Sequence, residues 1–174
     1  MAHSSEIEML DISKPAVKRG VNTGVVVAIH IGPTRLEPMT PVVEVNAIAG
    51  AGLEGDRYAR EEGSFSKKLP NNQLTLVEEE ALQAAARDYQ LELSAAESRR
   101  NILTAGIALN HLVGREFRIG GVRLRGLKLC EPCGHLKKLT RKEVIAALKH
   151  RGGLRAEILE GGLVRVGDEI REEN

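Results

Sequence analysis

The hydrophobic positions of this chain fall in short runs that suit β-strands. The β-branched run Gly24–Ile31 predicts a strand. Residues Pro41–Ala49 predict another, in which Val43, Val45 and Ala47 share one side. Glycine, proline and asparagine bound these runs and limit them to the usual length of a strand.

Later runs are grouped around glycine pairs. Glu116–Ile119 and Val122–Leu129 flank Gly120-Gly121, which predicts a hairpin. Leu154–Leu159 and Leu163–Ile170 flank Gly161-Gly162 and predict a second hairpin. Two further short strands are expected at residues 73–77 and 99–103.

Two segments have the pattern of helices. Glu78–Tyr89 is rich in alanine and acidic in its first turn. A second helix is expected to begin at Thr140, with Glu143 completing a capping box, and to end at Gly152-Gly153. Residues 109–113 predict one helical turn. Many close hairpins and few helices predict a mainly β fold, an irregular, mostly antiparallel barrel with peripheral helices.

Composition indicates one globular domain. The 174 residues are 42% hydrophobic and 2% aromatic, so Val, Ile, Leu and Ala must build the core. We expect residues 1–21 to be a flexible lead-in and residues 22–174 to form the domain. No apolar run reaches the roughly 20 residues of a membrane span, and the lead-in lacks a signal-peptide core. We therefore expect a cytoplasmic protein with reduced thiols and no membrane partner.

Charge is distributed unevenly. Residues 115–155 contain twelve Lys or Arg and three acidic residues, a net charge of +9, while the whole chain carries +1. One interpretation is a surface that meets an anion. The other is a set of strands whose solvent face carries Arg118, Arg123 and Arg125. Scarce aromatic residues argue against base stacking, so nucleic acid is not an expected partner.

Cys130 and Cys133 are the only cysteines, and they form a CxxC pair. Such a pair suggests a redox thiol, a metal clip or a sulfur-handling site. A thioredoxin-like site needs a βαβ unit, whereas hairpins surround this pair. A structural zinc site needs four ligands, and although His135 and His150 are available, no second CxxC is present.

The two cysteines differ in their surroundings. Leucines precede Cys130, which favours a buried core position. Cys133 lies between Pro132 and Gly134, which fix a turn and expose its side chain. Lys137 and other basic residues follow it, and positive charge favours a thiolate that could accept sulfur or bind a soft metal.

Two other segments carry candidate polar residues. Arg99 and Arg100, followed by Asn101, are expected on a strand with the arginines on opposite faces. One guanidinium would then face inward, where it needs an anion, or both would lie outside. The turn Gly52–Tyr58 contains Asp56, which is placed to orient Arg57 or a ligand.

These segments together resemble the MOSC domain, the C-terminal part of molybdenum-cofactor sulfurases, and in particular its small stand-alone bacterial members. The resemblance covers nearly all of the chain after Asn22. Its pieces, in family order, are GLEGDRYA (52–59), NQLTLVEEEAL (72–82), SRRNIL (98–103), LNHLVGREFRIGGVRLRG (109–126), LCEPCGHL (129–136) and GGLRAEILEGGLVRVGDEI (152–170).

The resemblance implies a MOSC-type β-barrel that binds a molybdenum–pterin cofactor or carries sulfur for one. The family's cysteine falls on Cys133, which would be a molybdenum ligand or a persulfide-forming thiol. Its Arg-x-Asn motif falls on Arg99 and Asn101, and Arg100 departs from relatives that have proline there. The full set of residues expected to contact the cofactor is Glu54, Asp56, Arg57, Arg99, Arg100, Asn101, His135 and Lys137, with Cys130 as a second thiol.

The resemblance also implies partners. Full sulfurases have a separate pyridoxal-phosphate domain, so we expect no pyridoxal phosphate in this chain. A sulfurase, or a reductase that donates electrons for reduction of N-hydroxylated compounds, is the partner it suggests. Two alternatives remain open at this point: an anion- or RNA-binding barrel without catalysis, and a carrier in which Cys130 and Cys133 form a disulfide.

Overall fold

The computed structural model describes residues 22–34, 36–60 and 73–173. Its helices are α1 (Glu79–Tyr89), α2 (Gly134–Leu139) and α3 (Val144–Ala147), with one 3-10 turn, η2 (Leu109–Leu112). Its strands are β1 (Thr23–Ile31), β2 (Thr40–Val42), β3 (Glu44–Ile48), β4 (Gly52–Leu53), β5 (Leu74–Glu78), β6 (Ile102–Ala105), β7 (Glu116–Ile119), β8 (Val122–Leu129), β9 (Leu154–Glu160), β10 (Gly162–Arg165) and β11 (Glu169–Glu172).

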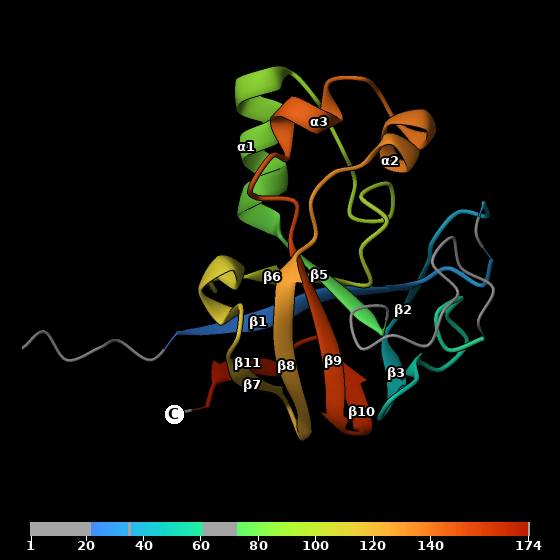
Figure 1. Ribbon diagram of the computed structural model, residues 1–174, viewed down its shortest axis with the longest axis vertical. Coiled ribbons are helices and arrows are strands. Elements are labelled where there is room, and N and C mark those ends of the chain that lie inside the picture. Colours follow the sequence, from blue (N-terminus) through green and yellow to red (C-terminus); the bar gives the residue numbers. More distant parts are fainter. Residues whose placement is uncertain (1–21, 35, 61–72, 174) are drawn as a thin grey trace, which may run out of the picture.

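The centre of the fold is a closed barrel of seven strands in the order β11-β7-β8-β9-β5-β6-β1. Pairing of β1 with β11 closes the barrel, and β2 extends it from β1 (Figure 1). Only β5 and β6 run parallel among these pairs. Helix α1 lies in the connection between them, as a parallel pair requires a crossover. The predicted mainly β, mostly antiparallel barrel is thus confirmed.

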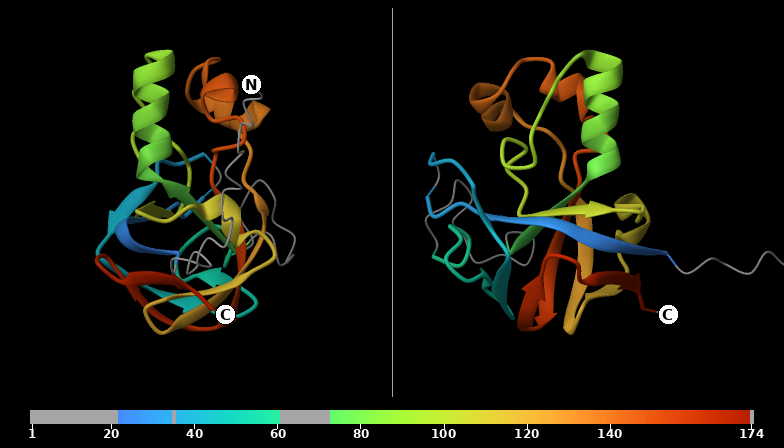
Figure 2. Two further views of the ribbon diagram at one scale, coloured as in Figure 1. Left: turned by 90° about the vertical axis from the view of Figure 1, so that its left-hand side faces the viewer. Right: turned by 180° about the vertical axis from the view of Figure 1, so that it is seen from behind.

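Alternation along the strands fills the barrel. In β7 the side chains of Phe117 and Ile119 are fully buried, while Arg118 between them faces outward. The three helices cover one end of the barrel, where α1 and α3 pack together (Figures 1 and 2). A second apolar cluster, which includes Leu91 and Leu148, lies beneath them.

The predicted strand at residues 41–49 divides into two. Val43 is 79% exposed, whereas Val45 and Ala47 are buried. β2 stays on the barrel beside β1, and β3 joins a separate sheet in the order β10-β3-β4. The break at Val43 lets consecutive strands belong to different sheets.

The second predicted hairpin is wrong. β9 pairs with β5 and β8, whereas β10 pairs with β3. The chain between them crosses close to β3, because a Cβ on Gly161 would lie 2.6 Å from the carbonyl oxygen of Ala47. Glycine is therefore required here by a close backbone approach rather than by a two-residue turn. The first hairpin, between β7 and β8, is confirmed.

The predicted capping box is also wrong. The hydroxyl of Thr140 donates to the carbonyl oxygen of Leu136 (2.7 Å), so it closes α2 instead of opening a helix. Glu143 makes no side-chain cap to α3, which is only four residues long. The helix at α1 is confirmed, although Glu78 lies just before it and accepts a hydrogen bond from the backbone of Leu109 (2.6 Å).

One expectation, the flexible lead-in at residues 1–21, concerns a part of the chain outside the described residues. Within the described ranges, no helix is both long enough and apolar enough to cross a membrane.

His30 on β1 is expected to make stability depend on pH. Its ring is buried, and its Nδ1 has no hydrogen-bond partner among the described residues. Burial lowers the pKa of His30 below its ordinary value of 6.5. The unfolded chain therefore takes up a proton that the folded chain resists, and stability should fall as pH decreases below about 6.5.

Urea unfolding at pH 7.5 and pH 5.5 can test this. We expect His30→Phe to reduce the difference between the two midpoints, because the ring no longer titrates. His111→Phe, at an exposed position, is the control and should leave the difference unchanged. An undiminished difference in His30→Phe would contradict the assignment.

Candidate functional site

The CxxC segment connects the barrel to its helical cap. It follows the last residue of β8, and the backbone N–H of Cys130 donates to the carbonyl oxygen of Gly153 (2.7 Å) beside the start of β9. Cys130 is only 2% exposed. Cys133 is exposed and directly precedes α2, whose first backbone bond runs from Lys137 to the Cys133 carbonyl oxygen (3.0 Å). The two thiols thus differ in their exposure to solvent, in the way that their neighbours in sequence indicate.

Both cysteines line one pocket between the barrel rim and α2. Its empty volume is about 460 Å³, including space open to solvent at its mouth. Four segments far apart in the chain contribute to it. The lining residues are Arg57, Tyr58, Arg99, Arg100, Cys130, Glu131, Cys133, His135, Leu136 and Arg155. Four arginines and a single carboxylate make this pocket suited to an anion.

Arg100 holds the pocket wall in place. It is 7% exposed, and its guanidinium donates to the carbonyl oxygens of Gly152 (2.9 Å), Ser98 (2.9 Å) and Cys130 (2.7 Å). These bonds tie the CxxC segment to the turn that precedes β6 and to the start of β9. Arg100 therefore positions Cys130 and, through the same segment, Cys133.

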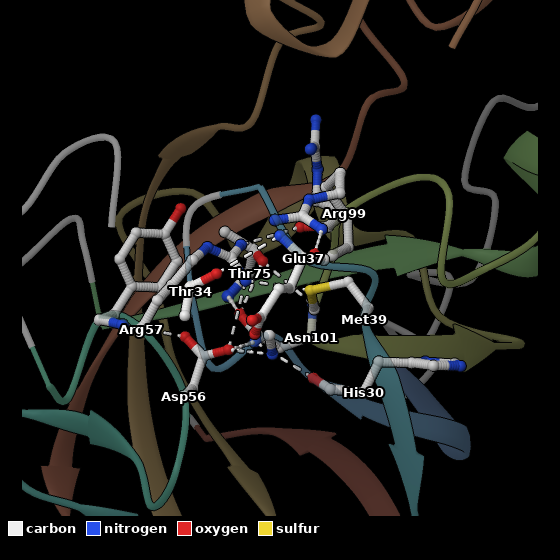
Figure 3. Close-up of polar contacts among 12 residues, drawn as sticks. His30, Thr34, Glu37, Met39, Asp56, Arg57, Thr75, Arg99 and Asn101 are labelled. Carbon is white, nitrogen blue, oxygen red and sulfur yellow. Dashed lines mark hydrogen bonds and ion pairs between the residues drawn. The ribbon is translucent and has the colours of Figure 1, made fainter. Parts of the chain in front are cut away.

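Arg99 approaches the pocket from the same turn. Its φ of 62° is left-handed, and β6 begins only at Ile102, so the predicted strand placement of both arginines is wrong. This turn, rather than strand alternation, brings both side chains to one pocket. The Arg99 guanidinium donates to the carbonyl oxygen of Glu37 (Figure 3). Burial and repulsion from Arg57 lower the pKa of Arg99, and the charge of an anion beside it would offset that lowering.

A buried polar network supports Arg57. Asp56 is fully buried and accepts hydrogen bonds from the backbone of Gly32 (2.8 Å) and Tyr58 (3.1 Å) and from Asn101 Nδ2 (3.1 Å) (Figure 3). It also pairs with Arg57 at 3.3 Å. The Arg57 guanidinium lies 4.7 Å from the centre of the Tyr58 ring. Asp56 thus holds the Arg57 guanidinium in a fixed orientation from the buried side of the pocket wall.

Asn101 belongs to this network and does not line the pocket. Its Oδ1 accepts hydrogen bonds from the hydroxyl and the backbone N–H of Thr75 (2.9 and 3.2 Å), and its Nδ2 also donates to the His30 carbonyl oxygen (3.2 Å). The structure therefore assigns Asn101 a framework position that joins β1, β5 and the 54–58 turn. Its predicted contact with a cofactor is indirect in this arrangement.

The other predicted residues separate into two groups. His135 lines the pocket. Glu54 is exposed and accepts a hydrogen bond from Asn46 Nδ2 (2.8 Å), and Lys137 is exposed on α2, so neither of these lines it. The fold therefore does not bring Glu54 or Lys137 to the pocket, and their contact with a cofactor stays a prediction.

Arg155 and Tyr58 are pocket residues that the sequence did not single out. Arg155 lies on β9 between the buried Leu154 and Ala156, and therefore faces away from the barrel interior. Burial lowers the pKa of Arg155, but the nearby Cys130, Tyr58 and Cys133 outweigh burial and hold it above its ordinary value. The alternation of β9 was the available signal, but it could not distinguish a pocket from solvent.

Most arginines of the basic strands belong to a different surface. Arg118, Arg123 and Arg125 face outward on β7 and β8, as the solvent-face interpretation predicts. Each forms ion pairs of 2.5–3.1 Å with glutamates on this surface, namely Glu116, Glu157, Glu160 and Glu173. The positive charge of these three arginines is therefore matched by neighbouring glutamates on this surface.

Comparison with known proteins agrees with this arrangement. The sequence matches the MOSC domain over residues 29–171. The chain belongs to the MOSC domain family. This match spans all of the pocket segments, from Arg57 to Arg155. No curated protein matches the sequence.

Solved structures show the same MOSC fold at low sequence identity. The YuaD protein from Bacillus subtilis is 15% identical with a TM-score of 0.75, over 89% of this chain and 99% of that one. YiiM from Geobacillus stearothermophilus is 14% identical (TM-score 0.66, covering 87% and 75%). YiiM from Escherichia coli is 18% identical (TM-score 0.62, covering 88% and 69%).

Alkylation is expected to distinguish the two thiols of this MOSC domain. A brief pulse of iodoacetamide near neutral pH should modify Cys133 first, because its side chain is exposed while Cys130 is buried. Peptide mapping by mass spectrometry gives the extent at each site. Labelling after denaturation is the control and should be equal. Preferential labelling of Cys130 in the folded protein would contradict the structure.

Proposed function

We propose that this MOSC protein binds a molybdenum–pterin cofactor, with Cys133 as the metal ligand or as the acceptor of sulfur destined for the cofactor. One observation carries the proposal: the exposed thiol of Cys133 lies at a pocket with four arginines in its wall. A soft thiolate suits molybdenum, and guanidinium groups suit phosphate and other anions.

The donor set fits this group in its chemistry. Among the described residues, no three His, Cys, Asp or Glu side chains gather to hold a metal ion. Cys133 would therefore be a single protein ligand, and the remaining ligands would come with the cofactor. When bound, the cofactor would supply a metal centre capable of electron and oxygen-atom transfer.

The residues of the chain itself would bind and orient. Arg57 and Arg99 would hold the anionic part of the cofactor, and Arg155 would attract it from the β9 wall. Arg100 would keep the CxxC segment at a fixed distance from these arginines through its bonds to backbone carbonyls. Water exclusion would come from Leu136 and Tyr58.

The proposed reaction class is reduction of N-hydroxylated compounds, with electrons supplied by a reductase partner. The alternative within the same proposal is sulfur transfer from a sulfurase partner. In that case the Cys133 thiolate attacks the donor's persulfide, takes its outer sulfur and releases the donor's thiolate. Both roles use the same exposed thiol and the same anion-binding wall.

A second candidate is a thiol–disulfide carrier. It is favoured by the presence of Cys130 and Cys133 in one pocket. Their oxidation would release two protons and pass two electrons to a partner disulfide, which becomes two thiols. This role needs both cysteines and gives no reason for Arg57, Arg99 and Arg155 in the wall, so we place it second.

Metal and pterin analysis tests the proposal. The protein should be isolated from a host that makes the cofactor, and its molybdenum content compared with that of the same protein from a cofactor-deficient host. We expect molybdenum and an oxidised pterin derivative only in the first preparation. Folded protein free of both, despite an abundant supply, would exclude the cofactor-binding role and leave the sulfur-acceptor role of Cys133, the second candidate and the non-catalytic anion- or RNA-binding barrel.

Nucleic-acid binding is expected to be weak. The arginines of β7 and β8 already form ion pairs with glutamates, so few are available to phosphates. Any affinity for RNA or DNA should therefore be low and should fall steeply with salt. Fluorescence anisotropy at two salt concentrations measures it. Submicromolar, sequence-selective binding at physiological salt would instead support the RNA-binding alternative.

A further inference from the structure

An apolar groove lies next to the Cys133 pocket. Its empty volume is about 530 Å³, including space open to solvent. It is lined by Leu36, Pro38, Met39, Ala96, Glu97, Arg99 and Leu139. The walls come from the segment after β1, the turn before β6 and the end of α2. Five of the seven side chains are apolar, in contrast to the arginine-rich pocket beside it.

The groove leaves large apolar side chains in contact with water. Leu36 is 69% exposed and Leu139 is 40% exposed, while Met39 beneath them is only 5% exposed. Single exposed leucines are common on protein surfaces and need no explanation. Two that line one hollow with a buried methionine form a surface on which a hydrocarbon group would lose contact with water.

Arg99 joins the groove to the pocket. It lines both, and its guanidinium bonds to the Glu37 carbonyl oxygen, within the segment that forms the groove wall. Helix α2 also contributes to both, with Leu136 in the pocket and Leu139 in the groove. A ligand whose charged end meets Arg99 therefore has the apolar groove within reach of its other end.

We infer that the site takes an amphipathic small molecule, with an N-oxygenated head at the mouth of the arginine-lined pocket beside Cys133 and an uncharged hydrocarbon body in the groove. This inference rests on the proposed function for the place of the head. It adds the class of substrate: a hydrophobic compound with one polar reactive end, rather than a sugar, a nucleotide or a small inorganic ion.

A homologous series of alkylphosphonates tests the inference by direct binding to protein free of cofactor, in which the phosphonate head takes the anion position beside Arg99. Methyl-, propyl- and hexylphosphonate share one head and differ only in the hydrocarbon. Full burial of one methylene contributes about 0.8 kcal/mol, roughly a fourfold change in Kd. Because the groove is open on one side, we expect calorimetry to show about a two- to threefold lower Kd for each added methylene.

Substitution in the groove should remove this dependence on chain length. Leu139→Asp and, on the opposite wall, Leu36→Asp should bind hexylphosphonate about as weakly as methylphosphonate. Val166→Asp is the matched control, because Val166 is 45% exposed and lies outside both hollows, and it should keep the full dependence. Should Leu139→Asp fail to fold, Leu36→Asp and the milder Leu139→Ser give the same comparison.

Equal affinity across the series in the wild type would overturn the inference, and so would full chain-length dependence in both leucine variants. If no phosphonate binds, both the groove inference and the proposed position of the ligand's head fail. Molybdenum analysis of the same protein keeps the two proposals apart. If the protein retains molybdenum but shows no chain-length dependence, only the groove inference fails. If it shows chain-length dependence but holds no molybdenum, only the cofactor role fails.

Discussion

Cys133→Ser is expected to abolish molybdenum retention by protein isolated from a cofactor-making host. A hydroxyl is a poor substitute for a soft thiolate, and no cluster of alternative protein ligands occurs among the described residues. The exposed position of Cys133 means that the substitution should leave the fold intact. Elemental mass spectrometry measures the molybdenum content per protein molecule. A thermal unfolding curve of the same sample checks that the variant is folded.

Two further variants distinguish a metal-ligand role of Cys133 from a disulfide-carrier role. Cys130→Ala should retain most of the metal; alanine is preferable to serine because the site is buried and a hydroxyl would need a partner. Arg99→Ala should weaken retention but leave Cys133 open to alkylation, because it removes an anion partner and not the ligand. Equal loss in Cys130→Ala and Cys133→Ser, with Arg99→Ala unaffected, would favour the disulfide carrier instead.

Asp56→Ala is expected to destabilise the protein by about 3–5 kcal/mol, the usual cost of removing one partner of a buried ion pair. The loss would leave the buried charge of Arg57 without its carboxylate, and it would deprive the Gly32 backbone and Asn101 of an acceptor. Chemical unfolding monitored by circular dichroism measures the change in the free energy of unfolding.

Glu54→Ala, on the same turn, is the matched control. Glu54 is exposed and accepts one hydrogen bond from Asn46, so its removal should change stability by no more than about 0.5 kcal/mol. Asp56→Asn should fall between the two, because it keeps the shape and one acceptor oxygen. Comparable effects of Asp56→Ala and Glu54→Ala would show that the buried network contributes little.

The local sequence pattern was sufficient to predict those features that depend on neighbouring residues in the chain. The Pro-Cys-Gly order predicted an exposed Cys133, and the leucines before Cys130 predicted its burial. Alternation predicted the outward direction of Arg118 and Arg123. The overall barrel followed from the density of short strands between turns, and the ordered motifs indicated the MOSC family.

Other features depend on contacts that no local pattern contains. Arg99 adopts a left-handed backbone, which propensity does not favour for arginine. β10 pairs with β3, a strand more than 100 residues earlier in the chain, and not with its expected partner β9. Arg155 faces a pocket because segments distant in sequence, including Tyr58 and Leu136, line the same hollow. Each case was decided by tertiary packing over strand or turn propensity.

The seam between β1 and β11 closes the barrel that carries the site. The first and last strands of the barrel pair with one another, so closure joins segments near opposite ends of the described sequence. Such distant pairing raises contact order and slows folding. During synthesis the last strand emerges after every pocket residue has left the ribosome. The arginine wall is therefore expected to become rigid only after this seam has closed.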